Sequence, residues 1–427
     1  MADPAPWGTL RVTRRCCGAG VCRNLAPGLL AEVSPEAGVG VPLIPGSWEP
    51  GAFTGVVRQP ATLEEHLAAR AAVAACAFGA LRMSRASEPV PAEHRGSPWK
   101  RFPRALEPGV WVVGQPSSRN YGALSYYLER PEGGVLVDPP KPTEALFRWL
   151  EAHGGVAWLV LTHRDHAQHH AEVAARFPGC RRVLGAADVN RRASRWEDAT
   201  DDVEVQVQDT GLPCRLDGSP ITLEALPDEE LALLPQPGHT PGGMCLLYRG
   251  RYLFTGDHLS WSSARRHLVA HRLVCWEDWE RQTASVGVLR GWARAGHLRF
   301  TWVLPGHGEW GELPGDGGPA ATAEALDQAV RWMEAQPPGR VSLMRWVPFV
   351  LARTKPEARF GRWVRRLGGG LGEAWLLPRA VRGYLPDYAP EVDAARRRRV
   401  AGAVALAAAA GAVLAWEAAR GGAGVVP

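Results

Sequence analysis

The chain has 427 residues, which is enough for two or three domains and a large buried core. The formal net charge is only +5, with basic residues concentrated near the C-terminus at Arg396–Arg399, so the charge gives no reason to expect a nucleic-acid partner. The first fifteen residues contain no long apolar stretch, so we expect no signal peptide and a reducing compartment, where the eight cysteines serve as ligands or free thiols rather than as disulfides.

Four of the cysteines fall in the first fifth of the chain. Cys16, Cys17 and Cys22 lie in one short loop, and Cys76 follows an alanine-rich segment at 63–75 that has helical character. An iron–sulfur cluster needs thiolates from a short wrapped loop and a further thiolate from a distant segment. The pattern therefore predicts a cluster site to which the helix 63–75 delivers Cys76.

These two segments resemble the cluster loop and the last-ligand segment of single-cluster bacterial-type ferredoxins. The resemblance implies a small ferredoxin-like α+β domain over residues 1–90, with a proline- and glycine-rich loop insertion at 34–55. The family has a cysteine where this chain has Ala19 and a proline where it has Ala77. Cys17 would then substitute as a ligand to a 4Fe–4S cluster, or three thiolates would hold a 3Fe–4S or a labile 4Fe–4S cluster. A zinc site and a domain without any cluster stay open as alternatives.

The following part of the chain alternates between strands and helices. Residues 134–138 are predicted to form a buried strand that ends in an acid, 143–153 a helix, and 158–161 the next strand, which is typical of a layered α/β core. Further strands are expected at 231–234, 252–254 and 300–304, and helices at 276–294 and 320–336.

Histidine and aspartate residues come directly after these strands, several of them beside glycine. They are His163, Asp165, His166, His239, Asp257, His258 and His307. Strands fix the direction of such side chains, and glycine lets the backbone bend sharply enough for them to converge. Imidazoles and carboxylates that converge from strand ends are what a metal site needs, so the sequence predicts one here.

This order of motifs, from about 108 to 310, resembles the metallo-β-lactamase superfamily of metal-dependent hydrolases. The resemblance implies an αβ/βα sandwich over 104–336 with a metal site along one edge. It implies His163, Asp165, His239, His307 and a bridging Asp257 as ligands to one or two zinc or iron ions. The first motif departs from the usual His-x-His-x-Asp-His, because Asp165, Ala167 and Gln168 occupy the last three ligand positions.

The fusion of the two domains resembles a family of predicted metallo-hydrolases from oxygenic phototrophs, in which the first motif is similarly altered. That resemblance implies His170 as a further ligand, while we expect His166 and His169 to form the solvated start of a helix. His258 should point away from the site if its strand continues. Asp138 matches a structural acid of the fold, which we expect to orient a ligand.

The sequence Pro237-Gly238-His239-Thr240-Pro241-Gly242-Gly243 resembles the glyoxalase-II-like side of the superfamily. It implies a metal-bound hydroxide that attacks a small ester or thioester, with Asp257 and His239 as catalytic residues and a small molecule as substrate. Asp165 instead suits an iron-dependent redox enzyme, for which the N-terminal domain would be the link to an electron donor or acceptor. A non-catalytic sensor that carries a cluster is the third alternative.

The C-terminal part has no counterpart in these families. Residues 337–395 are predicted to be a basic helical extension, and 396–427 to contain a membrane helix and tail, because 400–416 carries no charge. The arginines before this segment would stay in the cytosol or stroma. We therefore expect a cytoplasmic or plastid-stromal protein with a membrane-anchored C-terminus, with a soluble alanine-rich helix as the alternative.

Overall fold

The computed structural model describes residues 6–13, 16, 18–33, 53–76, 79–117, 119–192, 198–272, 275 and 277–336. All of them belong to one compact unit, Met1–Val39 with Glu49–Arg340, and a second unit comprises Gly40–Trp48 with Val341–Pro427. Cys17, Ala77 and the predicted segments 337–395 and 396–427 lie outside the described residues. Within those ranges, no helix is long and apolar enough to cross a bilayer.

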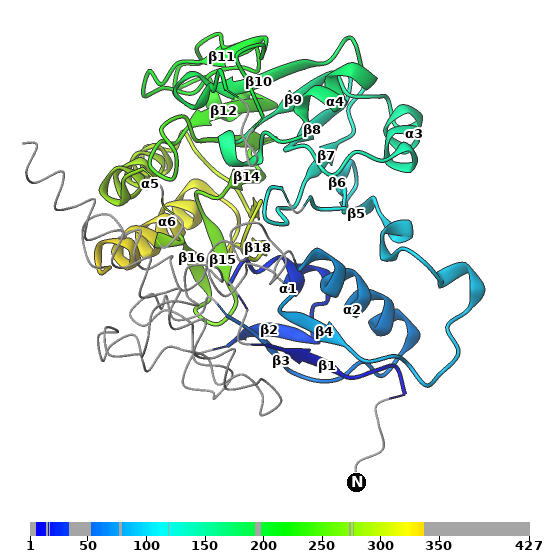
Figure 1. Ribbon diagram of the computed structural model, residues 1–427. Helices are drawn as coiled ribbons and strands as arrows, with labels where there is room; N and C mark the ends of the chain where they lie inside the picture. Colours follow the sequence, from blue (N-terminus) through cyan, green and yellow to red (C-terminus); the bar gives the residue numbers. More distant parts are fainter. Residues whose placement is uncertain are drawn as a thin grey trace, which may run out of the picture. The chain divides into compact units, whose positions relative to one another are not determined.

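Two β-sheets form the centre of the part from residue 104 onward (Figure 1). The first sheet has seven strands in the order β11-β10-β9-β8-β7-β6-β5, and β8, β9, β10 and β11 run parallel. Its strands are β5 (Arg104–Glu107), β6 (Val110–Val112), β7 (Tyr126–Leu128), β8 (Val135–Val137), β9 (Trp158–Val160), β10 (Arg181–Gly185) and β11 (Val205–Val207).

The second sheet has five strands in the order β12-β13-β14-β17-β18. They are β12 (Leu231–Pro235), β13 (Met244–Tyr248), β14 (Tyr252–Gly256), β17 (Trp302–Pro305) and β18 (Gly311–Glu312). Only β14 and β17 are parallel in this sheet. The loops after these two strands therefore leave the sheet at the same edge.

The strands bury both faces, because their side chains alternate between two different cores. In β8, Val135 and Val137 join the core between the sheets, whereas Leu136 packs with the helices outside the first sheet. In β14, Phe254 faces the other sheet and Leu253 faces the helices on the far side. Four layers result, which explains why a central strand such as β8 carries apolar residues at successive positions.

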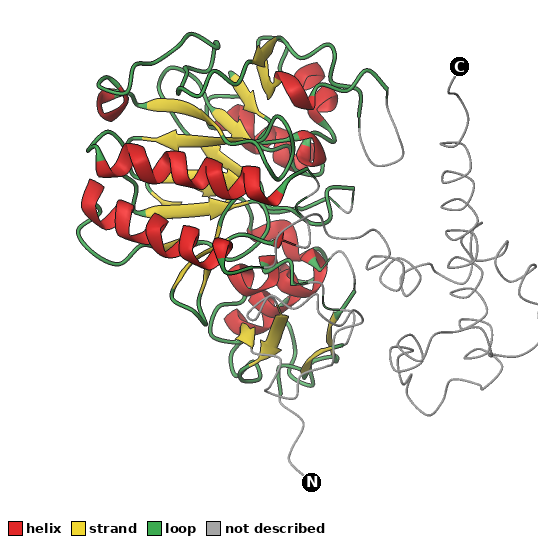
Figure 2. Ribbon diagram, turned by 90° about the vertical axis from the view of Figure 1, so that its left-hand side faces the viewer, coloured by secondary structure: helices red, strands yellow, loops and turns green. Residues whose placement is uncertain are grey.

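Helices cover both outer faces. Those of the first sheet are α3 (Glu144–Ala152) and α4 (His170–Arg176), and those of the second are α5 (Trp279–Arg294) and α6 (Pro319–Glu334). Figure 2 shows α5 and α6 lying side by side across the strands. The side chain of Thr143 caps α3, and that of Asp278 caps α5. The predicted αβ/βα sandwich, its helices and its strands are confirmed, with small shifts at their ends.

The described residues of the N-terminal region form two antiparallel strand pairs and two α-helices. The pairs are β1 (Leu10–Val12) with β4 (Leu81–Met83) and β2 (Leu30–Val33) with β3 (Phe53–Val56), and the helices are α1 (Val21–Leu25) and α2 (Leu63–Ala75). The predicted helix at 63–75 is confirmed as α2, which Thr62 caps through the amide of Glu65. The ferredoxin-like character of this region and the boundary between 1–90 and 104–336 stay predictions.

Short elements complete the described structure. They are β15 (Ser260–Ser262) paired with β16 (His267–Val269), and the 3₁₀ turns η2 (Ala92–His94), η3 (Pro98–Arg101), η4 (Arg164–His166), η5 (Ala186–Asp188) and η6 (Leu226–Asp228). The turn η4 matters most for function, because it follows β9 and carries the first histidine motif.

Candidate metal centre

The predicted motifs meet where strands of both sheets end. Asp138 and His163 follow the neighbouring parallel strands β8 and β9, and Asp257 and His307 follow β14 and β17. His239 comes from the loop after β12. Gly256, with φ at 52°, lets the chain turn after β14, because a Cβ atom there would lie 2.5 Å from the hydroxyl oxygen of Thr162.

One group of ligand atoms surrounds the Oδ2 atom of Asp257. The Nε2 atom of His163 lies 3.8 Å from it and that of His239 lies 3.7 Å from it. The Oδ2 atom of Asp165 is 3.9 Å from the His163 nitrogen and 3.7 Å from the His239 nitrogen. His163, Asp165 and His239 thus form a set that could hold a metal ion.

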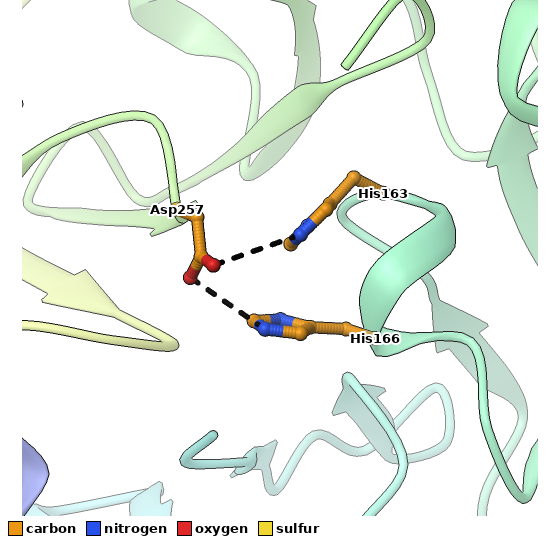
Figure 3. A group of neighbouring side chains, drawn as sticks. All are labelled: His163, His166 and Asp257. Carbon is orange, nitrogen blue, oxygen red and sulfur yellow. Dashed lines mark ion pairs between the residues drawn. The ribbon is translucent and has the colours of Figure 1, made fainter. Parts of the chain in front are cut away.

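A second group surrounds the other oxygen of the same carboxylate. The Oδ1 atom of Asp257 is 3.5 Å from Nε2 of His166 and 2.9 Å from Nδ1 of His307, and these two nitrogens are 3.3 Å apart. Figure 3 shows His163 and His166 approaching Asp257 from one side of the site. The carboxylate therefore lies between two sets of imidazoles, as a ligand that bridges two cations would.

The separations around His163, Asp165 and His239 suit a cation better than hydrogen bonds, whereas Nδ1 of His307 lies within hydrogen-bond distance of Asp257. Ligand atoms about 2.1 Å from a tetrahedral ion lie about 3.4 Å from one another, slightly closer than the 3.7–3.9 Å separations around Oδ2. The Nε2 atoms of His163 and His239 are buried and have no hydrogen-bond partner among the described residues. Buried nitrogens without a partner are destabilising unless something else, such as a metal ion, binds them.

Asp138 orients two of the histidines. Its Oδ2 atom accepts a hydrogen bond from Nδ1 of His166 (2.8 Å) and another from the hydroxyl of Thr162 (2.8 Å). Because that hydroxyl donates to Asp138, it accepts from Nδ1 of His163 (3.0 Å). Both rings consequently carry Nδ1–H and turn Nε2 toward Asp257, the arrangement that carboxylates outside a coordination shell impose on metal-binding histidines.

Asp188 forms hydrogen bonds to two of the motifs. No sequence pattern singled out this residue. Its Oδ2 atom accepts from the backbone N–H of Arg164 (3.0 Å) and from the hydroxyl of Thr240 (2.6 Å), and Oδ1 accepts from the N–H of Gly242 (2.8 Å). This buried carboxylate thereby links the turn that follows His163 to the loop that carries His239.

The electrostatics show how strongly these groups interact. Burial raises the pKa of Asp257, but the nearby His307 and His166 outweigh it and hold that pKa well below its usual range. Burial lowers the pKa of His166, but Asp257 and Asp138 raise it to about 9. For Asp165, burial is outweighed by His239 and His163, which hold the pKa at about 2. The acids are thus ionised, and His166 carries a positive charge while no cation is bound.

The structure corrects the expectation for His170. This residue begins α4 and does not reach the site, because both of its ring nitrogens are used elsewhere. Its Nε2–H donates to the carbonyl oxygen of Ala199 (2.8 Å), and Nδ1 accepts from the guanidinium of Arg182 (2.9 Å). No lone pair is left for a metal ion. The left-handed φ of His169, 73°, turns the chain away at this point.

His166 is the site residue that sequence reasoning missed. It is 1% exposed rather than part of a solvated helix start, and it joins His163 and Asp257 in a metal-binding geometry. The turn η4 explains this, because side chains three residues apart in a 3₁₀ turn lie on the same side. His169 bonds Ser117 and Glu172 instead. His258 is buried outside both sets, and burial, helped by His239, lowers its pKa to about 3.

Part of the chain is similar in sequence to a hydrolase. No protein-family model matches it. A hydroxyacylglutathione hydrolase of Anaeromyxobacter dehalogenans (strain 2CP-C) is 36% identical over 150 residues, which are 34% of this chain and 49% of that protein, so the match spans about half of the relative's length.

Solved structures with similar folds include a metallo-β-lactamase from Pontibacter korlensis (18% identity, TM-score 0.38, 55% of this chain and 98% of that one). The DIM-1 metallo-β-lactamase exposed to ceftazidime is another, with 14% identity and a TM-score of 0.37, and the match covers 53% of this chain and 95% of that one. The motif order, the α/β sandwich and the similarity to the hydrolase are the observations on which the function proposed below rests.

Proposed function

We propose that this protein is a metal-dependent hydrolase of small esters or thioesters. The observation that carries the proposal is the carboxylate of Asp257, whose two oxygens face two sets of imidazoles with the partnerless Nε2 atoms of His163 and His239 among them. His163, Asp165 and His239 would hold one zinc or iron ion, His166 and His307 a second, and Asp257 would bridge the two. When bound, such ions supply a hydroxide at neutral pH and polarise a carbonyl oxygen.

The substrate class rests on the relative. The name of the 36%-identical protein specifies the hydrolysis of an acylglutathione, in which the acyl group is bonded to sulfur, so we propose a small thioester or ester for this chain. The side chain of Tyr121 is 40% exposed, and its carbonyl oxygen lies 3.3 Å from Nε2 of His307. The loop that contains Tyr121 is therefore a candidate wall for the acyl or thiol portion of the substrate.

The test combines metal content with turnover. The full chain would be purified with zinc and assayed on a panel of acyl thioesters and esters, beside His239→Ala and Asp257→Asn. We expect turnover to fall in both variants by more than the roughly 10–100-fold that loss of a partner outside the coordination shell produces, together with loss of metal. His297→Ala, which changes a histidine on no predicted motif, is the control. Wild-type turnover by either ligand variant would overturn the proposal.

For the N-terminal region we propose an iron–sulfur cluster ligated by Cys16, Cys22 and Cys76, with Cys17 as the fourth candidate. Burial raises the pKa of the Cys22 thiol to about 12, and Cys16 and Cys76 lie near enough to add to the increase. Thiols that come from a short loop and from a distant segment are the ligands that an iron–sulfur cluster needs. Iron and acid-labile sulfide in anaerobically purified protein, lost in Cys76→Ser, would support the cluster. Zinc without sulfide would replace it with a zinc site.

A redox function is the second candidate, because Asp165 adds a second carboxylate to the set around His163. Carboxylate-rich sites favour iron over zinc, and a cluster would connect such a site to an electron donor or acceptor. Metal analysis separates the two candidates. Zinc in the histidine–aspartate site favours hydrolysis, whereas iron there and no turnover of any ester or thioester favours the redox enzyme.

A further inference from the structure

The loop that carries His307 is held on its far side by the N-terminal region. The backbone N–H of Gly308 donates to the carbonyl oxygen of Ala19 (2.7 Å). Asn24 spans the next residues, because its side-chain N–H donates to the carbonyl oxygen of Gly308 (2.9 Å) and its Oδ1 atom accepts from the N–H of Trp310 (3.1 Å). Each of these backbone groups lies within three residues of His307.

An ion pair and close packing reinforce this contact. The Nε atom of Arg23 lies 2.7 Å from Oε1 of Glu309, and both side chains are less than 10% exposed. Gly20 packs so closely that a Cβ atom there would lie 2.7 Å from the Cα atom of Gly308. The contact is therefore buried and closely packed, and it comes from one short segment, residues 19–24.

The near side of the loop is held by the sandwich itself. The N–H of Gly306 donates to the carbonyl oxygen of Gly256, and the N–H of His307 donates to Oδ1 of Asp257. His307 thus lies between bonds from β14 on one side and bonds from α1 and from Trp261 of β15 on the other. Asn24 bonds two backbone groups of residues 308–310, one through each end of its side-chain amide.

We infer that Asn24 is a positioning residue for the metal centre: it fixes the loop that aims Nδ1 of His307 at Asp257. This inference rests on the proposed metal-binding function. It makes α1, the helix that carries Cys22, part of the support of a site in the sandwich. Thr54 strengthens the link, because its hydroxyl lies 3.4 Å from the Cys22 sulfur and 3.5 Å from a guanidinium nitrogen of Arg23.

The test measures Co²⁺ binding, which needs no substrate. Titration of the metal-free full chain would follow the visible d–d bands, because thiolate binding gives separate sulfur-to-cobalt charge-transfer bands. We expect Asn24→Ala to bind Co²⁺ at the centre roughly 10–100-fold more weakly than wild type, with an altered band shape. Asn24→Asp should fall between the two, because it keeps the acceptor for Trp310 but loses the donor to Gly308.

The matched control is Gln59→Ala. Gln59 is also an amide of the N-terminal region that bonds a backbone N–H and a backbone carbonyl, but both belong to Leu10 in β1. Gln59→Ala should lower the stability of the N-terminal region and leave the Co²⁺ affinity unchanged. Equal losses of affinity in Gln59→Ala and Asn24→Ala would overturn the inference, because general destabilisation would then explain both.

A double-mutant cycle tests whether Asn24 acts through His307. If it does, Asn24→Ala added to His307→Ala should weaken Co²⁺ binding no further, since the loop then aims nothing at the metal. Additive losses would sink the inference. Failure of the proposed function looks different: wild type and Asp257→Asn would then bind Co²⁺ equally at the centre, whatever Asn24 does.

Discussion

At the scale of single residues, the same functional group does different work in different surroundings. Asp138, Asp188 and Asp257 are all carboxylates at strand ends or turns, but only Asp257 presents its oxygens to imidazole nitrogens that lack other partners. Asp138 and Asp188 are already fully engaged by donors of the protein. Whether a carboxylate can bind a metal ion or only supports the site thus depends on how many hydrogen-bond donors of the protein it already accepts from.

Alanine substitutions at His166 and His170 should have opposite effects on metal affinity and stability. His166→Ala should lower the affinity for zinc, because it removes the Nε2 atom that faces Asp257. His170→Ala should keep zinc affinity but lower the free energy of unfolding, because it removes one of the two acceptors of a buried guanidinium nitrogen of Arg182 and leaves only Asp202. Zinc titration against a chelator and thermal unfolding of both variants measure this. If His170→Ala loses zinc and His166→Ala keeps it, His166 is not a ligand and His170 is.

At the scale of elements, the site depends on two parallel pairs, one in each sheet. Parallel neighbours such as β14 and β17 release their loops at one edge, which places Asp257 and His307 together although they are fifty positions apart in the chain. The arrangement works only if the chain can turn at once after β14. Gly256 provides this turn against the Thr162 side chain.

Alanine at two glycines should therefore act in opposite directions. Gly256→Ala should destabilise the protein by about 1–3 kcal/mol and weaken zinc binding, because the added Cβ atom meets Thr162 and lies 3.2 Å from Nδ1 of His163. Gly291→Ala, inside α5 with nothing within 4 Å of its Cβ position, should stabilise the protein by about 0.5–1 kcal/mol. Chemical denaturation of both variants checks the signs. A neutral Gly256→Ala variant would contradict the close approach.

At the scale of the whole molecule, the centre joins parts that are distant in sequence. His163, Asp165 and His166 follow the first sheet, His239, Asp257 and His307 follow the second, and the N-terminal region supports the last of these. An ion held by this group therefore cross-links both sheets, and it binds the folded protein but not the unfolded chain.

Metal removal should consequently lower the stability of the described unit as a whole. At free zinc about a hundred times its dissociation constant, we expect the free energy of unfolding to rise by about 2.7 kcal/mol over the chelator-treated protein. Thermal melts with increasing zinc measure the effect, and Asp257→Asn should show little of it. A zinc-dependent shift as large in Asp257→Asn as in wild type would assign the stabilisation to another site, such as the N-terminal thiols.

The sequence by itself determined the layers, because apolar runs predict the strands and helices of the sandwich. It also predicted His163, Asp165, His239, Asp257 and His307 as candidate ligands, because strand ends fix the direction of the residues that follow them. That these residues bind a metal ion stays a prediction. The thiol cluster, the membrane helix and the substrate remain predictions from patterns and resemblance.

Only the tertiary structure decided between the histidines of the first motif. The sequence 163–170 offers four imidazoles at close spacing, and which of them face Asp257 depends on the 3₁₀ turn η4 and on partners from other segments. Arg182 and the carbonyl of Ala199 bond both ring nitrogens of His170, whereas the hydrogen bond from His166 to Asp138 leaves Nε2 of His166 facing Asp257. The contact between Asn24 and Gly308, 284 positions apart, was equally invisible, because no local pattern encodes which surfaces of two regions pack together.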